Sequence, residues 1–257
     1  MKKIIYYILF AVVSLLPVSC SDLLDEESKT EIEKGTYLKD AAEAETVLLG
    51  VYRDMSHDHM YGYYLSILFN LGTDMEQVEG STNENFRIIP TNSFPTTQAE
   101  VQYTWTKLYS LIYNANDFLG TIEDRIHSYT DADKALAQIY IAEARGLRGM
   151  YYFELLRWYG NIVLMTTTQM SQQHPSTFVQ ADPVKVYEYI EAALLYSIEN
   201  LPYATDDAYR KSNDYRLSKG GALGLLAKVY ATWAGYPVHD ASTGERAAKT
   251  AHVLVEA

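Results

Sequence analysis

The sequence contains a single cysteine, Cys20, among 257 residues, so no disulfide can form within the chain. Basic residues are also scarce, because 21 Lys and Arg stand against 33 Asp and Glu and give a net charge of -12. Nucleic acids and anionic lipid surfaces attract positive charge, so this balance argues against both as electrostatic partners. The chain also lacks a G-x-S-x-G, an H-E-x-x-H and a P-loop. We therefore expect no enzyme of these classes and no cofactor.

An apolar run near the N-terminus predicts a targeting segment. It extends from Ile4 to Leu16 after two lysines, which is shorter than the roughly 17–25 residues that a membrane-spanning helix needs. Cys20 follows shortly afterwards, with the small Ser19 before it, as at a bacterial lipoprotein cleavage site where the cysteine is lipidated. An ordinary signal peptide with a chance cysteine is the alternative, since Pro17 is unusual there. We predict a lipoprotein signal peptide over residues 1–19 and an acidic tether over residues 20–39.

Apolar residues at steps of three and four predict helices through the rest of the chain, residues 40–257. Asp40 with Glu43 predicts a capping box for the first of them, and Asp182 followed by Pro183 predicts another helix start. The expected helices run over residues 41–55, from Tyr103 to Ile122, from Thr130-Asp131 to a stop at Gly160, from Asp182 to Leu201, over residues 218–237, and over residues 244–254. We expect the chain to be truncated after this last helix.

The helix that ends near Gly160 is the predicted centre of the fold. One apolar stripe contains Tyr140, Ala144, Leu147, Tyr151, Leu155 and Trp158. A second stripe uses smaller residues, Ala142, Gly146, Gly149 and Phe153. Two stripes predict two packing neighbours, and the glycines predict a close approach by one of them. The remaining surface is assigned to Glu143, Arg145, Arg148, Glu154 and Arg157.

Pairing of large and small residues on successive helices is typical of tetratricopeptide-type repeats. The phase of the repeat drifts, so the sequence predicts an all-α, tetratricopeptide-like helical repeat stack with long inserted loops. The chain also has 23 Tyr against 7 Phe. Tyrosine suits both sugar-stacking surfaces and partly exposed packing positions, and the second use is the more common one.

The longest predicted loop runs from His57 to Gln102, and a second polar loop runs from Thr166 to Ala181. Loops of such length are usually functional or disordered. The first loop contains ring faces for sugar stacking and donors for hydroxyl groups, so we name as candidate ligand-binding residues Asn83, Asn85, Phe86, Arg87 and Phe94. These residues could equally pack the loop onto the helices. Trp105 lies in the apolar stripe of the next helix and is predicted to belong to the core.

Several segments resemble the SusD/RagB family, and they follow in the order Cys20 to Asp25, Trp105 with Tyr113 to Asn116, Glu143 to Gly160, and Lys219 to Tyr230. The resemblance implies a lipid-anchored, surface-exposed lipoprotein of the outer membrane with a tetratricopeptide-like platform. It further implies a TonB-dependent (SusC-like) transporter as partner and an oligosaccharide or peptide as ligand. Members of the family are longer, so we expect the C-terminal SusD/RagB region to be missing here.

Catalytic alternatives rest on weaker patterns. Asp74, Glu76, Glu79 and Glu84 could supply the paired carboxylates of a glycoside hydrolase on a helical toroid, but a charged loop would show the same residues. His57 and His59 could be two metal ligands, yet no third ligand is suitably spaced, so we expect no metal site. A tetratricopeptide-like scaffold that binds other proteins is the third possibility. We expect a non-enzymatic binding protein.

Overall fold

The computed structural model describes residues 37–71, 73, 75–76, 79–81, 85–91, 93–206 and 215–235. Apart from Tyr37, these residues belong to a compact unit that begins at Leu38. Cys20, the predicted signal peptide, most of the tether, Asn83 and the predicted helix over residues 244–254 lie outside the described residues. Their predictions therefore stay predictions.

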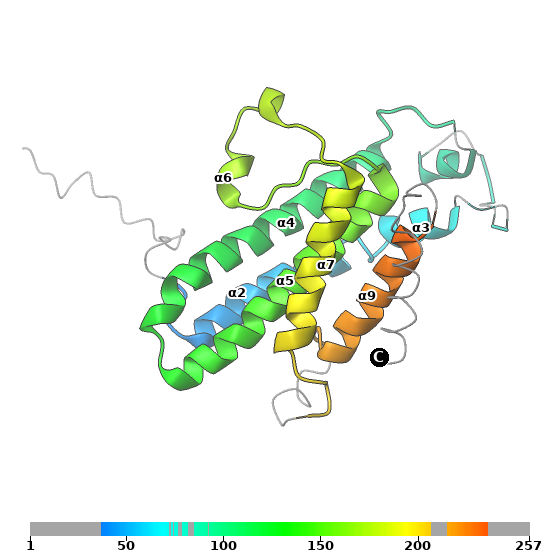
Figure 1. The fold of residues 1–257 in the computed structure, drawn as a ribbon. Coiled ribbons are helices and arrows are strands. Elements are labelled where there is room, and N and C mark those ends of the chain that lie inside the picture. Colours follow the sequence, from blue (N-terminus) through cyan, green and yellow to red (C-terminus); the bar gives the residue numbers. More distant parts are fainter. Residues whose placement is uncertain are drawn as a thin grey trace, which may run out of the picture. The chain divides into compact units, whose positions relative to one another are not determined.

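Within the described part the chain is all-α, without a strand, which confirms the predicted fold class (Figure 1). The longer helices are α2 (Ala41–Arg53), α3 (Tyr64–Leu71), α4 (Ala99–Arg125), α5 (Asp131–Tyr159), α7 (Pro183–Asn200) and α9 (Lys219–Trp233). The shorter ones are η2 (Asp54–Ser56), η3 (Asn85–Thr91), η4 (Ile126–Ser128), α6 (Thr168–Ser171) and η5 (Pro175–Thr177). None of the helices in these ranges is long and apolar enough to cross a membrane.

Local capping explains where these helices begin. The carboxylate of Asp40 accepts the backbone N–H of Glu43 at 2.9 Å, and Asp182 accepts that of Val184 at 2.8 Å. The Glu43 carboxylate in turn accepts from Lys39, one residue before the N-cap, so the predicted capping box is present in a shifted form. Helix α5 ends just before Gly160, which has a φ of 68°, the left-handed conformation that favours glycine.

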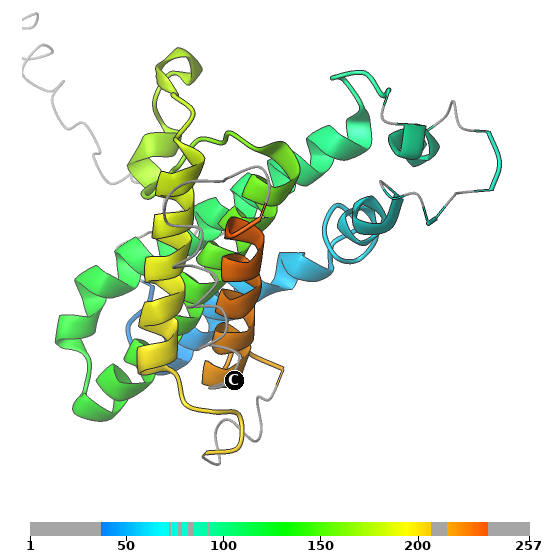
Figure 2. The same cartoon turned by 45° about the vertical axis from the view of Figure 1, so that its right-hand side comes forward.

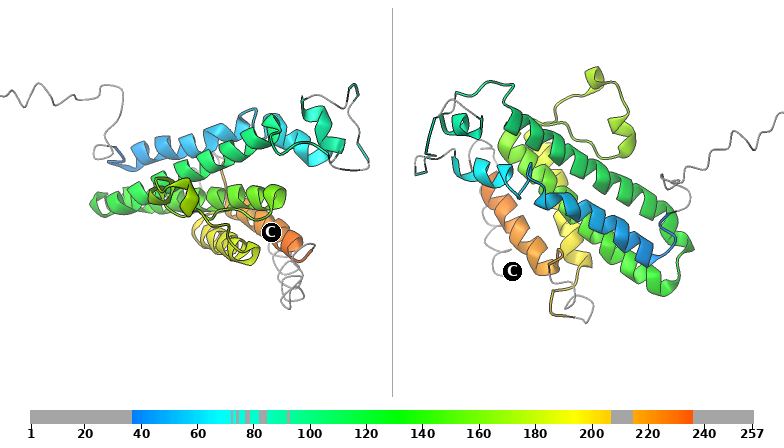
Figure 3. Two further views of the ribbon diagram at one scale, coloured as in Figure 1. Left: turned by 90° about the horizontal axis from the view of Figure 1, so that it is seen from above. Right: turned by 180° about the vertical axis from the view of Figure 1, so that it is seen from behind.

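Helix α5 lies in the middle of the unit. It contacts α2 and α4 on one side and α7 and α9 on the other, and Figure 3 shows this layering from above. The two predicted packing neighbours are therefore too few. Because four helices rather than two pack around α5, the assignment of all its charged residues to the surface is wrong: Glu143 is 0% exposed and Glu154 is 2% exposed.

The predicted close approach at Gly146 is confirmed. A Cβ at this position would lie 2.4 Å from Leu217 Cδ2 and 2.7 Å from the hydroxyl of Ser197 on α7. The space around Gly149 is wider, since its nearest neighbour is Ala193 Cβ at 3.4 Å. A side chain at Gly146 would have to displace Leu217 or Ser197, so the small stripe sets the distance between α5 and its neighbours.

Many of the tyrosines join elements through their hydroxyl groups. Tyr151 donates to Val51 O at 2.8 Å, Tyr129 to Leu38 O at 2.7 Å, and Tyr159 to Val101 O at 2.7 Å. Such a residue places an aromatic ring in the core and still satisfies its polar tip. For these tyrosines the packing interpretation is confirmed, and a ligand-binding role has to be sought among the exposed ones.

Several helix boundaries and one core assignment differ from the prediction: α4 ends at Arg125 rather than at Ile122, and α9 ends at Trp233 rather than at residue 237. Helix α2 ends at Arg53 rather than at residue 55, and α4 begins at Ala99, four residues before Tyr103. The side chain of Trp105 is half-buried rather than part of the core. Its ring centroid lies 4.9 Å from that of Tyr109 and 4.9 Å from that of Tyr159, so it packs at the edge of the helix stack.

Candidate functional site

The segment between α2 and α4 is held to the helices by a few buried apolar side chains. Met60 and Leu65 are 0% exposed, and Ile89 in η3 is 6% exposed. Gly62 allows a tight turn before α3, because a Cβ there would lie 2.3 Å from Ser56 O. Figure 2 shows α3 and η3 beyond the end of α2, in cyan and blue-green. Most of the predicted loop therefore has a defined fold, with helical turns that the sequence pattern did not predict.

Aromatic side chains meet on the surface of this segment, and we call them the ring cluster: His57, His59, Tyr63, Tyr64, Phe86 and Tyr103. The rings of His59 and Tyr103 stack at 4.6 Å with an angle of 15° between their planes. The ring of Tyr63 meets Phe86 edge-on at 5.9 Å. Tyr63 is 42% exposed and Tyr103 is 47% exposed, so ring surface is open to a ligand.

The surroundings of His59 favour its neutral form. Burial, together with the neighbouring His57 and Lys107, lowers the pKa of His59 below its ordinary value. The positive charge of Lys107 is itself paired with Asp54 at 3.2 Å. At neutral pH the His59 ring is therefore an uncharged plane with one nitrogen donor and one acceptor.

The structure brings together two of the predicted ligand-binding residues. The guanidinium carbon of Arg87 lies 5.1 Å from the centre of the Phe86 ring, within the range of a cation–π contact. Arg87 Nε also donates to Glu79 O at 3.3 Å, next to Gly80, which has a φ of 109°. This contact orients Arg87 and leaves its terminal nitrogens as donors at the edge of the ring cluster.

The other predicted residues are placed differently. Asn85 begins η3, but its side chain is not described, and Asn83 lies outside the described residues. Phe94 is 36% exposed and makes no ring contact with the cluster in the described part of the chain. Sequence reasoning missed Tyr63, Tyr103 and the stacking role of His59. The dense run His-Asp-His-Met-Tyr-Gly-Tyr-Tyr over residues 57–64 was a signal that could have found most of them.

The described residues give little support to the catalytic alternatives. Glu76 and Glu79 are exposed, whereas Asp74 and Glu84 lie outside the described part. His57 and His59 have neighbouring rings, 4.9 Å apart. Among the residues that the structure describes, no group of three or more His, Cys, Asp or Glu side chains is placed to hold a metal ion. A surface of rings and donors is suited to binding a polyol by stacking and hydrogen bonding.

Comparison with known proteins identifies the family. The family model SusD-like_3, described as "Starch-binding associating with outer membrane", matches residues 22–231. The chain belongs to the SusD-like family. A crystal structure of a SusD homolog from Bacteroides thetaiotaomicron VPI-5482 is 70% identical to the SusD-like chain and superposes with a TM-score of 0.83. That similarity covers 90% of this chain and 43% of the homolog.

Other relatives agree with this assignment. SusD-like protein P2 of Formosa agariphila is 27% identical over 90% of this chain and 43% of its own length. A structure titled as a laminarin binding SusD-like protein is 28% identical, with a TM-score of 0.65, over 82% of this chain and 42% of that one. The helical stack is thus the tetratricopeptide-like fold of SusD-like proteins. The SusD-like chain spans less than half the length of these relatives.

Proposed function

We propose that the SusD-like chain binds glycans without cleaving them, and that the ring cluster with Arg87 forms part of the binding surface. The single observation that carries this proposal is the ring cluster itself, with exposed rings of Tyr63 and Tyr103 and adjacent side-chain donors. The family description as starch-binding and the laminarin binding relative support the ligand class.

In this proposal, the exposed rings of the cluster stack on the sugar, and Arg87 donates hydrogen bonds to it. A sugar ring has an apolar C–H face that can lie on the exposed planes of Tyr63 and Tyr103, while its hydroxyl groups reach donors and acceptors at the rim. Arg87 supplies donors beside Phe86, and its bond to Glu79 O limits the side-chain freedom that a ligand would otherwise have to remove. Asn83, Asn85 and Phe94 remain proposed contributors.

The cellular context is part of the same proposal. The family is associated with the outer membrane. We propose that residues 1–19 are a signal peptide, that Cys20 carries the lipid anchor, and that the following residues tether the helical unit at the cell surface. The proposed partner is a TonB-dependent transporter to which the bound glycan, or in some members a peptide, is passed. A gene for such a transporter beside this one would support the partnership.

Calorimetry with a panel of neutral oligosaccharides, including laminarin fragments, tests the binding surface. We expect Phe86→Ala and Arg87→Ala each to weaken binding by about 5- to 30-fold, the range of a typical contact residue at 1–2 kcal/mol. Their melting temperatures should stay close to that of the unmodified chain, because both side chains are only half-buried and neither belongs to the core.

A matched control is Tyr203→Ala, which removes an aromatic residue that is 37% exposed but lies outside the ring cluster. Its affinity should equal that of the unmodified chain. If Phe86→Ala and Arg87→Ala lower stability and leave affinity unaltered, both residues only pack the segment onto the helices, and the proposed surface is wrong.

A further inference from the structure

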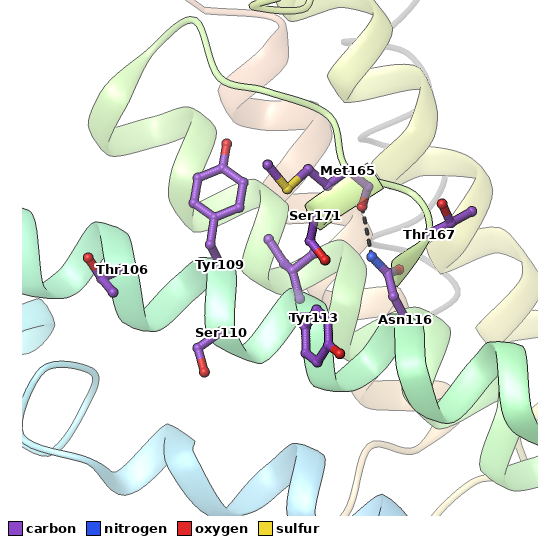
Figure 4. A pocket seen from close by; sticks show the side chains of 9 residues that line it. Thr106, Tyr109, Ser110, Tyr113, Asn116, Met165, Thr167 and Ser171 are labelled. Carbon is purple, nitrogen blue, oxygen red and sulfur yellow. Dashed lines mark hydrogen bonds between the residues drawn. The ribbon is translucent and has the colours of Figure 1, made fainter. Parts of the chain in front are cut away.

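A pocket of about 350 Å³ lies along α4, away from the residues of the ring cluster (Figure 4). One wall is the outer face of α4, and the other is the segment that follows α5, up to α6. The residues that line it are Thr106, Tyr109, Ser110, Ile112, Tyr113, Asn116, Met165, Thr167 and Ser171. It shares none of them with the ring cluster, so it is a separate feature of the surface.

Two residues of the lining, Tyr109 and Asn116, join the two walls of the pocket by hydrogen bonds. The Tyr109 hydroxyl donates to Val163 O at 2.9 Å and accepts from Val163 N at 3.0 Å, and burial raises the pKa of Tyr109 to about 12. Asn116 donates to Met165 O at 2.9 Å and accepts from Arg148 at 2.6 Å. These bonds use the polar atoms of Tyr109 and Asn116, so both walls are fixed before any ligand arrives.

Other hydroxyl groups of the pocket lining are available to a ligand. Within the described residues, the hydroxyls of Ser110, Tyr113 and Thr167 make no hydrogen bond to another part of the chain. Tyr113 is 38% exposed, and Figure 4 shows it one helical turn after Tyr109 on α4. The pocket thus combines a largely apolar wall, an open ring and several free hydroxyl groups.

This combination fits one ligand chemistry. The lining contains no charged side chain among the residues described, and the nearby Arg148 is directed to the amide of Asn116. A carboxylate or sulfate group would therefore enter without a charged partner, which is unfavourable. An uncharged sugar ring presents an apolar face for Tyr113 and hydroxyl groups for Ser110 and Thr167. The volume lies at the small end of the range for ligand pockets, so it suits one ring of a longer chain.

We propose that this pocket is a second saccharide subsite that takes a single neutral sugar ring. The inference rests on the proposed glycan-binding function, and it adds a site on the helical platform to the ring cluster on the loop segment. Tyr113 supplies the stacking surface, while Ser110 and Thr167 supply hydrogen bonds. Binding in two places would let one glycan chain, or two, be held by the same protein.

Protection of an introduced thiol tests the location directly. In the full chain with Cys20→Ser, the variant Ser171→Cys, at an exposed position of the lining that is assigned no contact with the sugar, is labelled with a maleimide in the presence and absence of a neutral glucan oligosaccharide. We expect the saturating oligosaccharide to slow labelling at least fivefold. Leu195→Cys, at a position that is 47% exposed on α7, is the control and should be labelled at an unchanged rate.

Further variants separate this proposal from the proposed function. Tyr113→Ala should abolish the protection of Ser171→Cys, whereas Phe86→Ala should leave it in place. Absence of protection in every variant would overturn the subsite, and the calorimetric effect of Phe86→Ala would still decide the ring cluster. Protection that disappears with Phe86→Ala would mean that ligand on the ring cluster shields the thiol. Stronger protection by a uronate-containing oligosaccharide than by the neutral one would overturn the ligand class.

Discussion

Arg216→Met is expected to lower the free energy of unfolding by about 3–5 kcal/mol, because it leaves a buried carboxylate without its charged partner. Arg216 and Glu143 are both fully buried, and Arg216 Nε donates to Glu143 Oε2 at 2.9 Å. Arg216 also donates to Glu45 on α2 at 2.6 Å. Tyr52 donates to Glu143 at 2.6 Å, and burial and the charge of Glu143 raise the pKa of Tyr52, so its phenol stays protonated.

Urea unfolding measures this effect, and two further variants interpret it. Lys185→Ala removes the exposed ion pair with Glu188 and should cost less than about 1 kcal/mol. Adding Glu143→Gln to Arg216→Met should recover part of the loss, since the uncharged amide is less costly to bury. If Arg216→Met costs no more than Lys185→Ala, the ion pair does not join α2, α5 and the segment before α9 in the way the structure indicates.

Cys20→Ala should transfer the protein almost completely from the membrane fraction to the soluble fraction. A lipoprotein anchor carries two or more acyl chains on this one cysteine, and stable membrane binding requires at least two such attachments. With the sole cysteine replaced, no thiol remains in the chain to be acylated. Cell fractionation followed by a salt wash measures the distribution of the protein.

Ser21→Ala is a suitable control for this experiment, because it changes the neighbouring residue and keeps the thiol. It should remain in the membrane fraction. If the Cys20→Ala protein still sediments with washed membranes, Cys20 is not the anchor and the predicted signal peptide ends in another way.

Local chemistry explains the parts of the fold that were predictable. Caps such as Asp40 and Asp182 act on backbone groups two or three residues away, so the sequence alone reveals them. The same holds for Gly160, whose backbone conformation ends α5. The close contact at Gly146 was also predictable, since a glycine within an apolar stripe of a helix usually has a packing reason.

Long-range pairing explains the parts that were not predictable. Glu143 was assigned to the surface because charged residues usually lie there, but its partner Arg216 is 73 residues further along the chain. In the candidate site, Phe86 and Arg87 could be proposed from the loop, whereas Tyr103 belongs to α4 and joins His59 only in the folded chain. Hydrophobic periodicity predicts which face of a helix a residue occupies, but it does not predict which aromatic residue far along the chain it contacts.

Recovery of the ligand shows whether this chain binds a glycan and leaves it intact, as we propose. The full chain is incubated with a neutral oligosaccharide that it binds by calorimetry, and the length of the oligosaccharide is followed over many hours. We expect all of the ligand to be recovered at its original length. Shorter products that accumulate in proportion to the amount of protein would show that the chain cleaves its ligand and favour a glycoside hydrolase.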